Sequence, residues 1–178
     1  MRQKGADIQT EERNDTLQWY AVRTFFRREK YVRDRLQDKG IEAWLPLQEK
    51  IRRYTRKVRK VQLPLISQYI FVKIDEDERA RVLEVEGVIQ FVRPSGYVVP
   101  IPQSEIDLLR RVIGEDVSTE VEEGTITEGD EVEIIAGELT GLKGQMIEER
   151  GKNRIAVNLT NMGLALWMEV PLSAVRKL

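Results

Sequence analysis

The sequence predicts an α+β protein with two folded modules: a small sandwich resembling the split βαβ arrangement, and a small all-β barrel. Three observations predict this fold class. Residues 17–114 alternate between strand-like and helix-like segments, residues 115–126 form an acidic linker with little to bury, and residues 127–178 carry short alternating strands between glycines. Residues 1–16 are polar and lack periodicity, so we expect a disordered tail there.

The first module should begin with a strand, a helix and a second strand. Residues 17–24, LQWYAVRT, are rich in aromatic and β-branched types, which favours a strand. Residues 26–39 are predicted to be helical, because apolar residues recur at helical spacing from Phe25 onward and Gly40 follows as a stop. Residues 41–47 alternate and predict a half-buried strand.

The next strand, at residues 64–74, has the strongest strand pattern in the chain. Its residues divide between two faces, with Ile70, Val72 and Ile74 on one and Tyr69, Phe71 and Lys73 on the other. The module is completed by a helix at 77–85, a strand at 88–93, an extended segment at 97–101 and a helix at 102–113. The connections are too short for a large doubly wound sheet.

The second module changes to a period of two. Its predicted strands are residues 130–136, 145–149, 154–159 and 165–170, with glycines between them. Strand-forming residues such as Val132, Ile134, Ile155 and Val157 favour a barrel that stays β.

The composition excludes several kinds of chemistry. The chain has no cysteine and no histidine, which removes disulfides, thiolate nucleophiles, Cys/His zinc sites and imidazole catalysis. No spacing typical of another catalytic or metal site is present, so we expect a non-enzyme without a cofactor or metal. No apolar run could serve as a membrane span or signal peptide, which predicts a cytoplasmic protein.

The charges divide the chain into two parts. It has 29 basic and 30 acidic residues in all. Residues 17–117 hold 20 basic and 15 acidic residues, a net charge of +5, whereas residues 118–178 hold 6 and 11, a net charge of −5. This asymmetry predicts two modules with different partners.

The densest charge cluster is KIRRYTRKVRK at residues 50–60, in which seven of eleven residues are basic and none is acidic. Its apolar spacing suits a helix, and its Tyr, Thr and Val content suits a strand, so both structures remain open. In either case mutual repulsion predicts a solvent-facing arm. Such a string of cations attracts phosphates without reading their sequence.

Four segments together resemble the NusG family of transcription elongation factors, which have an N-terminal NusG domain, a linker and a C-terminal KOW barrel. They are WYAVRT at 19–24, PLISQYIFV at 64–72, GVIQFVRPSGYVVPIP at 87–102 and EGDEVEIIAGELTGLKGQM at 128–146. The resemblance covers residues 17–178. The phrases GIEAWLP, PLxxxYIFV and EGVIQFVR are similar to specialised antiterminators of the RfaH and UpxY kind, which implies action on long operons for surface polysaccharides or secondary metabolites.

The resemblance implies a monomeric elongation and antitermination factor that grips the clamp helices of the largest RNA polymerase subunit through an apolar concavity. The matching positions are Tyr69, Phe71, Phe91, Ile106 and Leu109. Helices should cover only one face of the sheet, which leaves an aromatic patch for a partner. The competing interpretation makes these residues core. Arg79 and Arg81 would stand in for the His-Thr-Thr patch that contacts the polymerase gate loop in RfaH-like members, and the competing interpretation is a solvated helix face.

The resemblance also implies contacts with upstream DNA and with the non-template strand. The expected cations are Arg23, Arg27, Arg28 and Lys30 at the first helix, and Lys50, Arg52, Arg53, Arg56, Lys57, Arg59 and Lys60 in the arm. The aromatic residues Phe25, Phe26 and Tyr54 lie among these cations and are suited to stacking on an unpaired base. The alternative is a solvated surface.

For the barrel, the resemblance implies docking on a small-subunit ribosomal protein or on the termination factor Rho through Leu139, Leu142 and Met162. Leu142 could instead belong to the barrel core. Two rival functions remain. One is a ribosome- or RNA-binding protein that does not use polymerase, which the acidic barrel disfavours. The other is an enzyme with a carboxylate metal site at residues 75–78, where a helix cap is the simpler interpretation.

Overall fold

The computed structural model describes residues 17–54, 57–114, 119–126, 128–149 and 152–178. The described chain divides into two compact units. The first contains the chain up to Leu45 with residues 67–92 and 98–102, and the second contains residues 46–66, 93–97 and 103–178. The predicted tail and residues 115–118 of the predicted linker lie outside the described residues.

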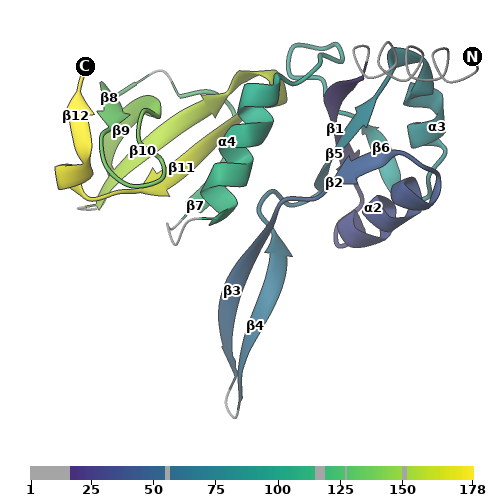
Figure 1. Cartoon of the computed structure of the whole chain (residues 1–178), viewed down its shortest axis with the longest axis horizontal. Coiled ribbons are helices and arrows are strands. Elements are labelled where there is room, and N and C mark those ends of the chain that lie inside the picture. Colours follow the sequence, from purple (N-terminus) through teal and green to yellow (C-terminus); the bar gives the residue numbers. More distant parts are fainter. Residues whose placement is uncertain (1–16, 55–56, 115–118, 127, 150–151) are drawn as a thin grey trace, which may run out of the picture. The chain divides into compact units, whose positions relative to one another are not determined.

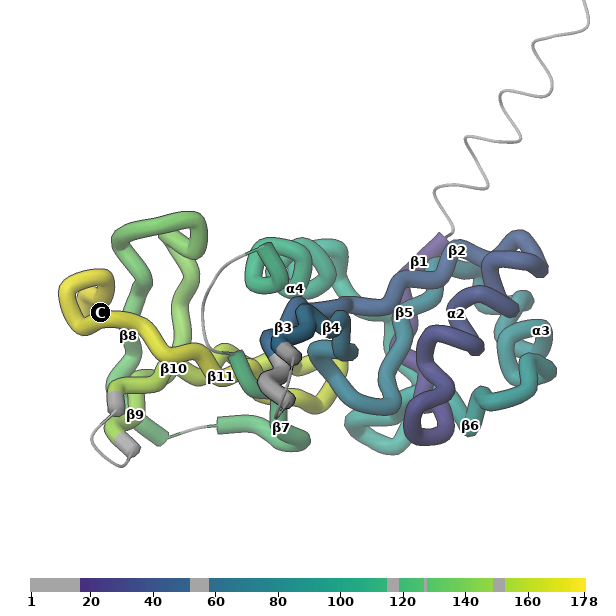
Figure 2. Tube along the Cα trace, turned by 90° about the horizontal axis from the view of Figure 1, so that it is seen from below, coloured from purple at the N-terminus to yellow at the C-terminus, as the bar shows by residue number. Residues whose placement is uncertain are grey.

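A four-stranded antiparallel sheet forms the first unit (Figure 1). In spatial order its strands are β2 (Glu42–Trp44), β5 (Tyr69–Ile74), β1 (Gln18–Thr24) and β6 (Val88–Phe91). The helices are α2 (Glu29–Asp38) and α3 (Arg79–Leu83), and the 3-10 turn η1 (Glu76–Glu78) precedes α3. Both helices lie on the same side of the sheet (Figure 2).

The core of the first unit lies between these helices and one face of the sheet. β5 contributes Ile70, Val72 and Ile74, as its alternation predicts, and α2 contributes Val32 and Leu36 from one stripe. Each of these five side chains is at most 1% exposed. Burying an aliphatic side chain of this size stabilises a fold by about 1.5–3 kcal/mol. This face of the sheet therefore serves as the core of the unit.

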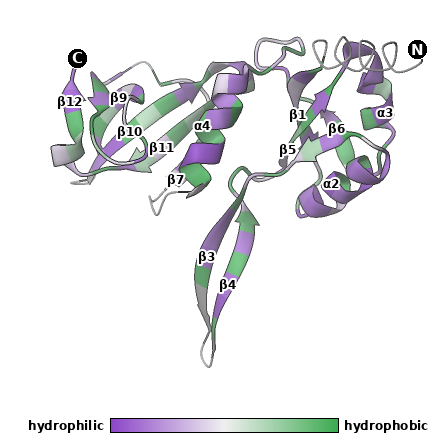
Figure 3. Ribbon diagram, viewed as in Figure 1, coloured by the Kyte–Doolittle hydropathy of each residue, from purple (hydrophilic) through white to green (hydrophobic). Residues whose placement is uncertain are grey.

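The basic arm is a β-hairpin. Strands β3 (Leu47–Tyr54) and β4 (Lys57–Pro64) pair in register and form a two-stranded sheet of their own (Figure 1). This decides between the helix and the strand that the sequence left open. Figure 3 shows a largely hydrophilic hairpin with isolated apolar positions, and among them Ile51 and Val58 are 62% and 66% exposed.

The second unit also holds helix α4 (Gln103–Gly114) and a six-stranded antiparallel sheet, called the C-terminal sheet below. Its strands, in spatial order, are β12 (Val175–Lys177), β8 (Asp130–Ile134), β9 (Lys143–Glu149), β10 (Lys152–Leu159), β11 (Leu164–Glu169) and β7 (Thr119–Glu123). Two 3-10 turns, η2 (Thr160–Met162) and η3 (Leu172–Ala174), join them. Gly144 is required in β9, because an added Cβ would lie 2.5 Å from the carbonyl oxygen of Ala156.

The predicted α+β class is confirmed, while several element boundaries differ. Strand β7 lies inside the segment predicted to be a linker, and the extended segment at 97–101 forms only an isolated bridge between Ile101 and Trp19. Helix α2 begins at Glu29, so Phe25 and Phe26 lie in the loop before it instead of on a helix. None of the helices in the described residues is both long and apolar enough to cross a membrane.

Candidate functional site

The second face of the four-stranded sheet is aromatic. The register pairs Arg23 with Tyr69 and Ala21 with Phe71 across β1 and β5, and Trp44 of β2 lies opposite Phe71 on the other side. Paired residues share a face, and residues alternate between faces along a strand, so these side chains lie opposite the helix-covered core. The sequence predicted this grouping of Tyr69 and Phe71.

This aromatic face is closed in the structure, contrary to the expectation of an exposed patch. Tyr69 is 5% exposed, Phe71 is fully buried and Trp19 is 3% exposed. The rings of Trp44 and Phe71 have centroids 5.6 Å apart, and the Arg23 guanidinium lies 5.7 Å from the Tyr69 ring centroid. A partner can therefore reach these rings only after the face has been uncovered.

Phe91 does not belong to this face. It pairs with Val22 across β1 and β6, which puts it on the helix-covered side. It is 3% exposed, and its ring meets that of Tyr20 edge to face at 6.0 Å. The prediction that Phe91 shares an exposed concavity with Tyr69 and Phe71 is therefore wrong, because strand alternation assigns it to the core.

The two predicted contact residues on α4 are also buried. Ile106 and Leu109 are fully buried, and Val112 continues their stripe at 2% exposed. Their burial agrees with the core interpretation, which the sequence left open beside partner contact, and their role in polymerase binding stays a prediction.

Helix α4 makes polar contacts with loops of the C-terminal sheet within the same unit. The Arg111 guanidinium donates to the carbonyl oxygens of Glu138 at 2.7 Å and Thr140 at 3.2 Å. The backbone N–H of Asn161 donates to a carboxylate oxygen of Glu105 at 3.3 Å. Burial raises the pKa of the Glu105 carboxyl above its ordinary value, although the Asn161 hydrogen bond acts in the opposite direction.

These contacts lie at the loops expected to bind a partner. Leu139 is 4% exposed, Met162 is 1% exposed and Leu142 is half-buried. Leu139 and Met162 are therefore buried, and their role in docking stays a prediction. Sequence reasoning missed Glu105 and Arg111, because charged residues on the polar side of a helix give no signal that distinguishes a contact from a solvated face.

The hairpin presents its cations unequally. Its register pairs Lys50 with Val61, Arg52 with Arg59 and Tyr54 with Lys57. Strand alternation then places Lys50 and Arg59 on one face and Lys60 on the other, while Arg52, Arg53 and Lys57 are strand residues. The backbones of these residues lie in the two strands, whereas Arg56 lies outside the described residues.

On the hairpin face that holds Lys60, an acidic residue pairs with the cation. The Lys60 ammonium lies 2.8 Å from a carboxylate oxygen of Glu49, and this contact raises the pKa of Lys60. Glu49 pairs with Gln62, so it shares the face of Lys60 and not that of Lys50. The face of Lys50 and Arg59 therefore carries cations without an acid from either strand.

The remaining predicted cations gather around the loop between β1 and α2, called the β1–α2 loop (residues 25–28). Arg23 is the penultimate residue of β1, Arg27 and Arg28 lie in this loop, and Lys30 is in the first turn of α2. Arg27, Arg28 and Lys30 are exposed, and Arg28 lies 3.6 Å from Glu86. The structure thus brings together the four cations that the sequence placed at the first helix.

The two arginines expected at the polymerase gate loop make contacts within the chain. Arg79 lies 3.0 Å from Glu76 and its guanidinium lies 4.9 Å from the Tyr20 ring centroid. Arg81 lies 2.7 Å from Glu78 and donates to the carbonyl oxygen of Lys39 at 3.0 Å. A gate-loop contact by these residues would have to replace some of these interactions.

The acidic run at residues 75–78 caps a turn. The Asp75 and Glu78 side chains and backbones form a capping box around η1. Within the described residues, no group of three or more carboxylates is arranged to hold a metal ion. The helix-cap interpretation therefore accounts for these acids.

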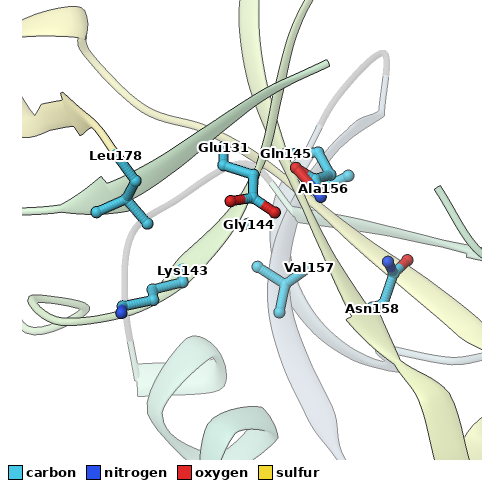
Figure 4. Close-up of a pocket in the computed structure, with 8 residues that line it drawn as sticks. All are labelled: Glu131, Lys143, Gly144, Gln145, Ala156, Val157, Asn158 and Leu178. Atoms are coloured by element: carbon cyan, nitrogen blue, oxygen red, sulfur yellow. The ribbon is translucent and has the colours of Figure 1, made fainter. Parts of the chain in front are cut away.

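A cavity of about 370 Å³ opens beside β8, β9 and β10 (Figure 4). It contains none of the predicted site residues. The Asn158 side chain on its wall is already engaged, since it accepts from the Ile126 N–H at 2.9 Å and donates to the Ile126 carbonyl at 2.8 Å. We assign no ligand to this cavity.

An aromatic sheet face, a cationic hairpin and a six-stranded C-terminal sheet are features of an α+β protein suited to binding other molecules. The family model described as "NusG: Transcription termination factor nusG" matches residues 17–110, more than half of the chain. The chain belongs to the NusG family and is a transcription elongation or termination factor. Members of this family are non-enzymatic.

One solved structure agrees with this assignment at the level of the fold. A Thermotoga maritima NusG structure, described for its domain interaction, is 24% identical with a TM-score of 0.56, and the match covers 93% of this chain and 99% of that one. A chain of the MjSpt4:Spt5 complex is 19% identical with a TM-score of 0.33, covering 90% of this chain and 96% of that one. No curated protein sequence matches this chain significantly.

Proposed function

We propose that this chain is a specialised elongation and antitermination factor that binds the clamp helices of RNA polymerase and suppresses pausing and termination. Family membership implies polymerase binding, and the clamp helices are the finer proposal. The factor acts in the cytoplasm as a monomer without a cofactor. The similarity of GIEAWLP and EGVIQFVR to RfaH-like and UpxY-like antiterminators supports a polysaccharide-type operon as its target.

The aromatic sheet face is the observation that carries this proposal. A sheet needs one apolar face for its core, and here that face is filled by residues such as Ile70 and Val72. The opposite face nevertheless holds Trp19, Trp44, Tyr69 and Phe71. Aromatic residues dominate the binding energy of protein interfaces, so this face is suited to anchor a partner once it is uncovered.

The remaining surfaces supply secondary contacts. The cationic hairpin face with Lys50 and Arg59 binds the phosphates of upstream DNA without sequence specificity. The C-terminal sheet, with its net charge of −5 over residues 118–178, recruits a ribosomal small-subunit protein or Rho through the loops holding Leu139 and Met162. Two linked weak contacts bind more tightly than either alone, because the second becomes intramolecular.

The test is retention of the full chain on purified RNA polymerase. Tyr69→Ala should weaken retention at least tenfold, since a buried aromatic anchor contributes about 2 kcal/mol or more to an interface. Tyr97→Ala is the matched control, because Tyr97 is an aromatic residue that is 65% exposed and lies outside the strands of the aromatic face. Circular dichroism should first establish that both variants are folded. Equal retention of wild type and a folded Tyr69→Ala variant would refute the anchor.

The same preparation tests the rival ribosome-binding function. An RNA-binding protein that does not use polymerase would bind ribosomal RNA and show no retention on polymerase. The acidic C-terminal sheet disfavours this outcome, because its net charge repels phosphates.

A further inference from the structure

Strand β7 is an edge strand of the C-terminal sheet with little buried apolar surface. It lies beside β11, and its register runs from Thr119 opposite Met168 to Glu123 opposite Leu164 (Figure 1). Three of its five residues are glutamates, a residue type that is depleted in strands. Thr119 is buried, Val121 is half-buried and the glutamates are exposed, whereas the first five residues of β11 are all buried. Few buried apolar contacts give a segment low local stability, so β7 is suited to detach while the rest of the sheet stays folded.

Side chains of β10 hold this segment on the sheet. The Asn158 amide accepts a hydrogen bond from the Ile126 N–H at 2.9 Å and donates one to the Ile126 carbonyl at 2.8 Å. The Arg154 guanidinium donates to a carboxylate oxygen of Glu120 at 2.6 Å. These contacts fasten residues 119–126, called the strap below, near both of its ends.

The strap occupies a large part of the connection between α4 and the C-terminal sheet. Helix α4 ends at Gly114, and β8 begins at Asp130. While the strap is docked, residues 115–118 alone join α4 to the sheet, and four residues span at most ~14 Å. When the strap is detached, residues 115–129 join them, and fifteen residues span at most ~54 Å. Docking of the strap therefore limits how far the C-terminal sheet can move from α4.

The Asn158 contact with the strap is separable from the core of the sheet. Asn158 lies in β10 between Val157 and Leu159, which are both buried. Successive residues of a strand point to opposite faces, so the Asn158 side chain lies on the face opposite these two core residues. Loss of its amide removes two hydrogen bonds to the strap and leaves the apolar face of β10 unchanged.

We infer that the strap controls the length of the tether between α4 and the C-terminal sheet, with Asn158 as the positioning residue that keeps the strap docked. The docked strap holds the sheet close to α4, and the detached strap lets the sheet reach a partner farther away. Such a partner binds only the detached state and shifts the population toward it. Because the effective concentration of a tethered module depends on its linker length, the strap sets the strength of the second contact. The inference rests on the proposed function for the identity of that partner.

The first test is limited proteolysis of the full chain by a protease that cuts after glutamate, together with hydrogen exchange. A paired strand is cut only when it opens, so the rate of cleavage at the glutamates of the strap follows the detached fraction. Asn158→Ala loses two net hydrogen bonds, so this cleavage and the exchange of the amides at residues 119–123 should both accelerate about thirtyfold. Cleavage after Glu169 in β11 reports unfolding of the sheet itself and should not change.

Asn153→Ala is the matched control for Asn158→Ala. Asn153 lies in the same strand, five residues earlier, and strand alternation places its side chain on the opposite face of the sheet. Its replacement should leave cleavage and exchange in the strap at the rates of the wild type.

The second test measures the reach of the C-terminal sheet. The chain has no cysteine, so Ser104→Cys in α4 and Ser173→Cys in η3 provide two specific dye positions for single-molecule energy transfer. Both serines are exposed. Arg111→Ala serves as the background, because it removes the hydrogen bonds between α4 and the loop of the sheet. In this background Asn158→Ala should add a population of lower transfer efficiency, and Asn153→Ala should not.

Four results would overturn the inference. They are cleavage of the wild-type strap as fast as in the urea-unfolded chain, unchanged cleavage in Asn158→Ala, equal acceleration at Glu169, or faster strap cleavage with an unchanged distribution of transfer efficiency. These measurements contain neither polymerase nor a second partner. Their failure would leave the clamp-helix proposal standing, and loss of polymerase retention alone would leave the strap standing.

Discussion

At the residue scale, Gln68 carries strain that a single substitution can release. Its φ of 64° disfavours any side chain with a Cβ, whereas its backbone N–H and carbonyl make bonds that glycine would keep. Gln68→Gly should therefore stabilise the folded chain by about 0.5–1 kcal/mol, since relief of strain exceeds the added entropy of the unfolded chain. Urea unfolding followed by circular dichroism measures the change.

The matched control at this position is Gln68→Val. A β-branched side chain is the least tolerated in a left-handed conformation, so this variant should be destabilised by more than 1 kcal/mol. If glycine and valine shifted stability in the same direction, backbone strain at Gln68 would not be the cause.

Individual residues also show which features of the sheet could be predicted from the sequence and which could not. Alternation in residues 64–74 correctly separated Ile70 and Val72 from Tyr69 and Phe71. It could not show that both faces would be buried, because the alternation within one strand does not reveal what covers either face. Phe91 was misplaced because its face depends on the pairing of β6 with β1, which a single strand does not reveal.

At the element scale, the hairpin should bind duplex DNA through one face. Lys50 and Arg59 lie on the face without an acid, whereas Lys60 on the other face is 2.8 Å from Glu49. Each phosphate contact contributes about 0.9 to the slope of log affinity against log salt. The Lys50→Gln, Arg59→Gln double variant should therefore lower the slope for a DNA duplex by nearly 2, measured by fluorescence anisotropy.

Lys60→Gln is the control for this prediction. Its ammonium is already paired, so its loss should change the slope by much less than one unit. Equal effects from both faces would mean that the hairpin attracts DNA only through its total charge.

The contact between α4 and η2 should depend on pH through Glu105. Burial raises the folded-state pKa of this carboxyl above the unfolded value near 4.3, so the folded state binds the proton more tightly. The stability contributed by Glu105 is then greatest below the unfolded pKa, and it falls as pH rises through the folded pKa.

Glutamine cannot ionise, although it keeps an acceptor for the Asn161 N–H. The unfolding free energy of Glu105→Gln should therefore exceed that of wild type by an amount that grows from about pH 4 upward and levels off once Glu105 is ionised in both states. Urea titrations at several pH values measure this difference. A difference that is constant with pH would show that the Glu105 carboxyl titrates alike in the folded and unfolded states.

The elements themselves were predictable where a local pattern was sufficient. β1, β5, β6 and the helices α2 and α4 follow from composition and periodicity. The structure of the hairpin remained ambiguous because the spacing of its apolar residues also fits a helix. The pairing of β3 with β4, which makes it a hairpin, is not visible in either segment alone. Strand β7 was missed because TEVEE is acidic and pairs with β11, some forty residues later, so no local signal marks it.

At the scale of the whole molecule, the nearly neutral total charge combines a basic part and an acidic part. The total charge of −1 combines +5 over residues 17–117 with −5 over residues 118–178. A neutral total charge keeps long-range nonspecific attraction to nucleic acid low, whereas the phosphate contacts proposed for the basic part act at close range. The sequence revealed this charge division directly, and family membership makes the chain a transcription factor. The contacts of α4 with the C-terminal sheet could not be foreseen, because they join charged side chains to backbone groups.

Those contacts lead to a prediction about how the C-terminal sheet becomes available. Arg111 donates to the carbonyls of Glu138 and Thr140, on either side of the buried Leu139. A net hydrogen bond contributes about 1 kcal/mol, so losing both bonds in Arg111→Ala should open the loop at residues 137–142 about thirty times more often. Hydrogen exchange of the amides in that loop should accelerate by the same factor, and affinity for a ribosomal small-subunit protein or Rho should rise in parallel. Arg110→Ala is the matched control, since Arg110 lies 3.4 Å from Asp107 within α4 itself. Unchanged exchange in Arg111→Ala would show that the arginine does not hold the loop, whereas faster exchange without tighter binding would show that this loop is not where the partner docks.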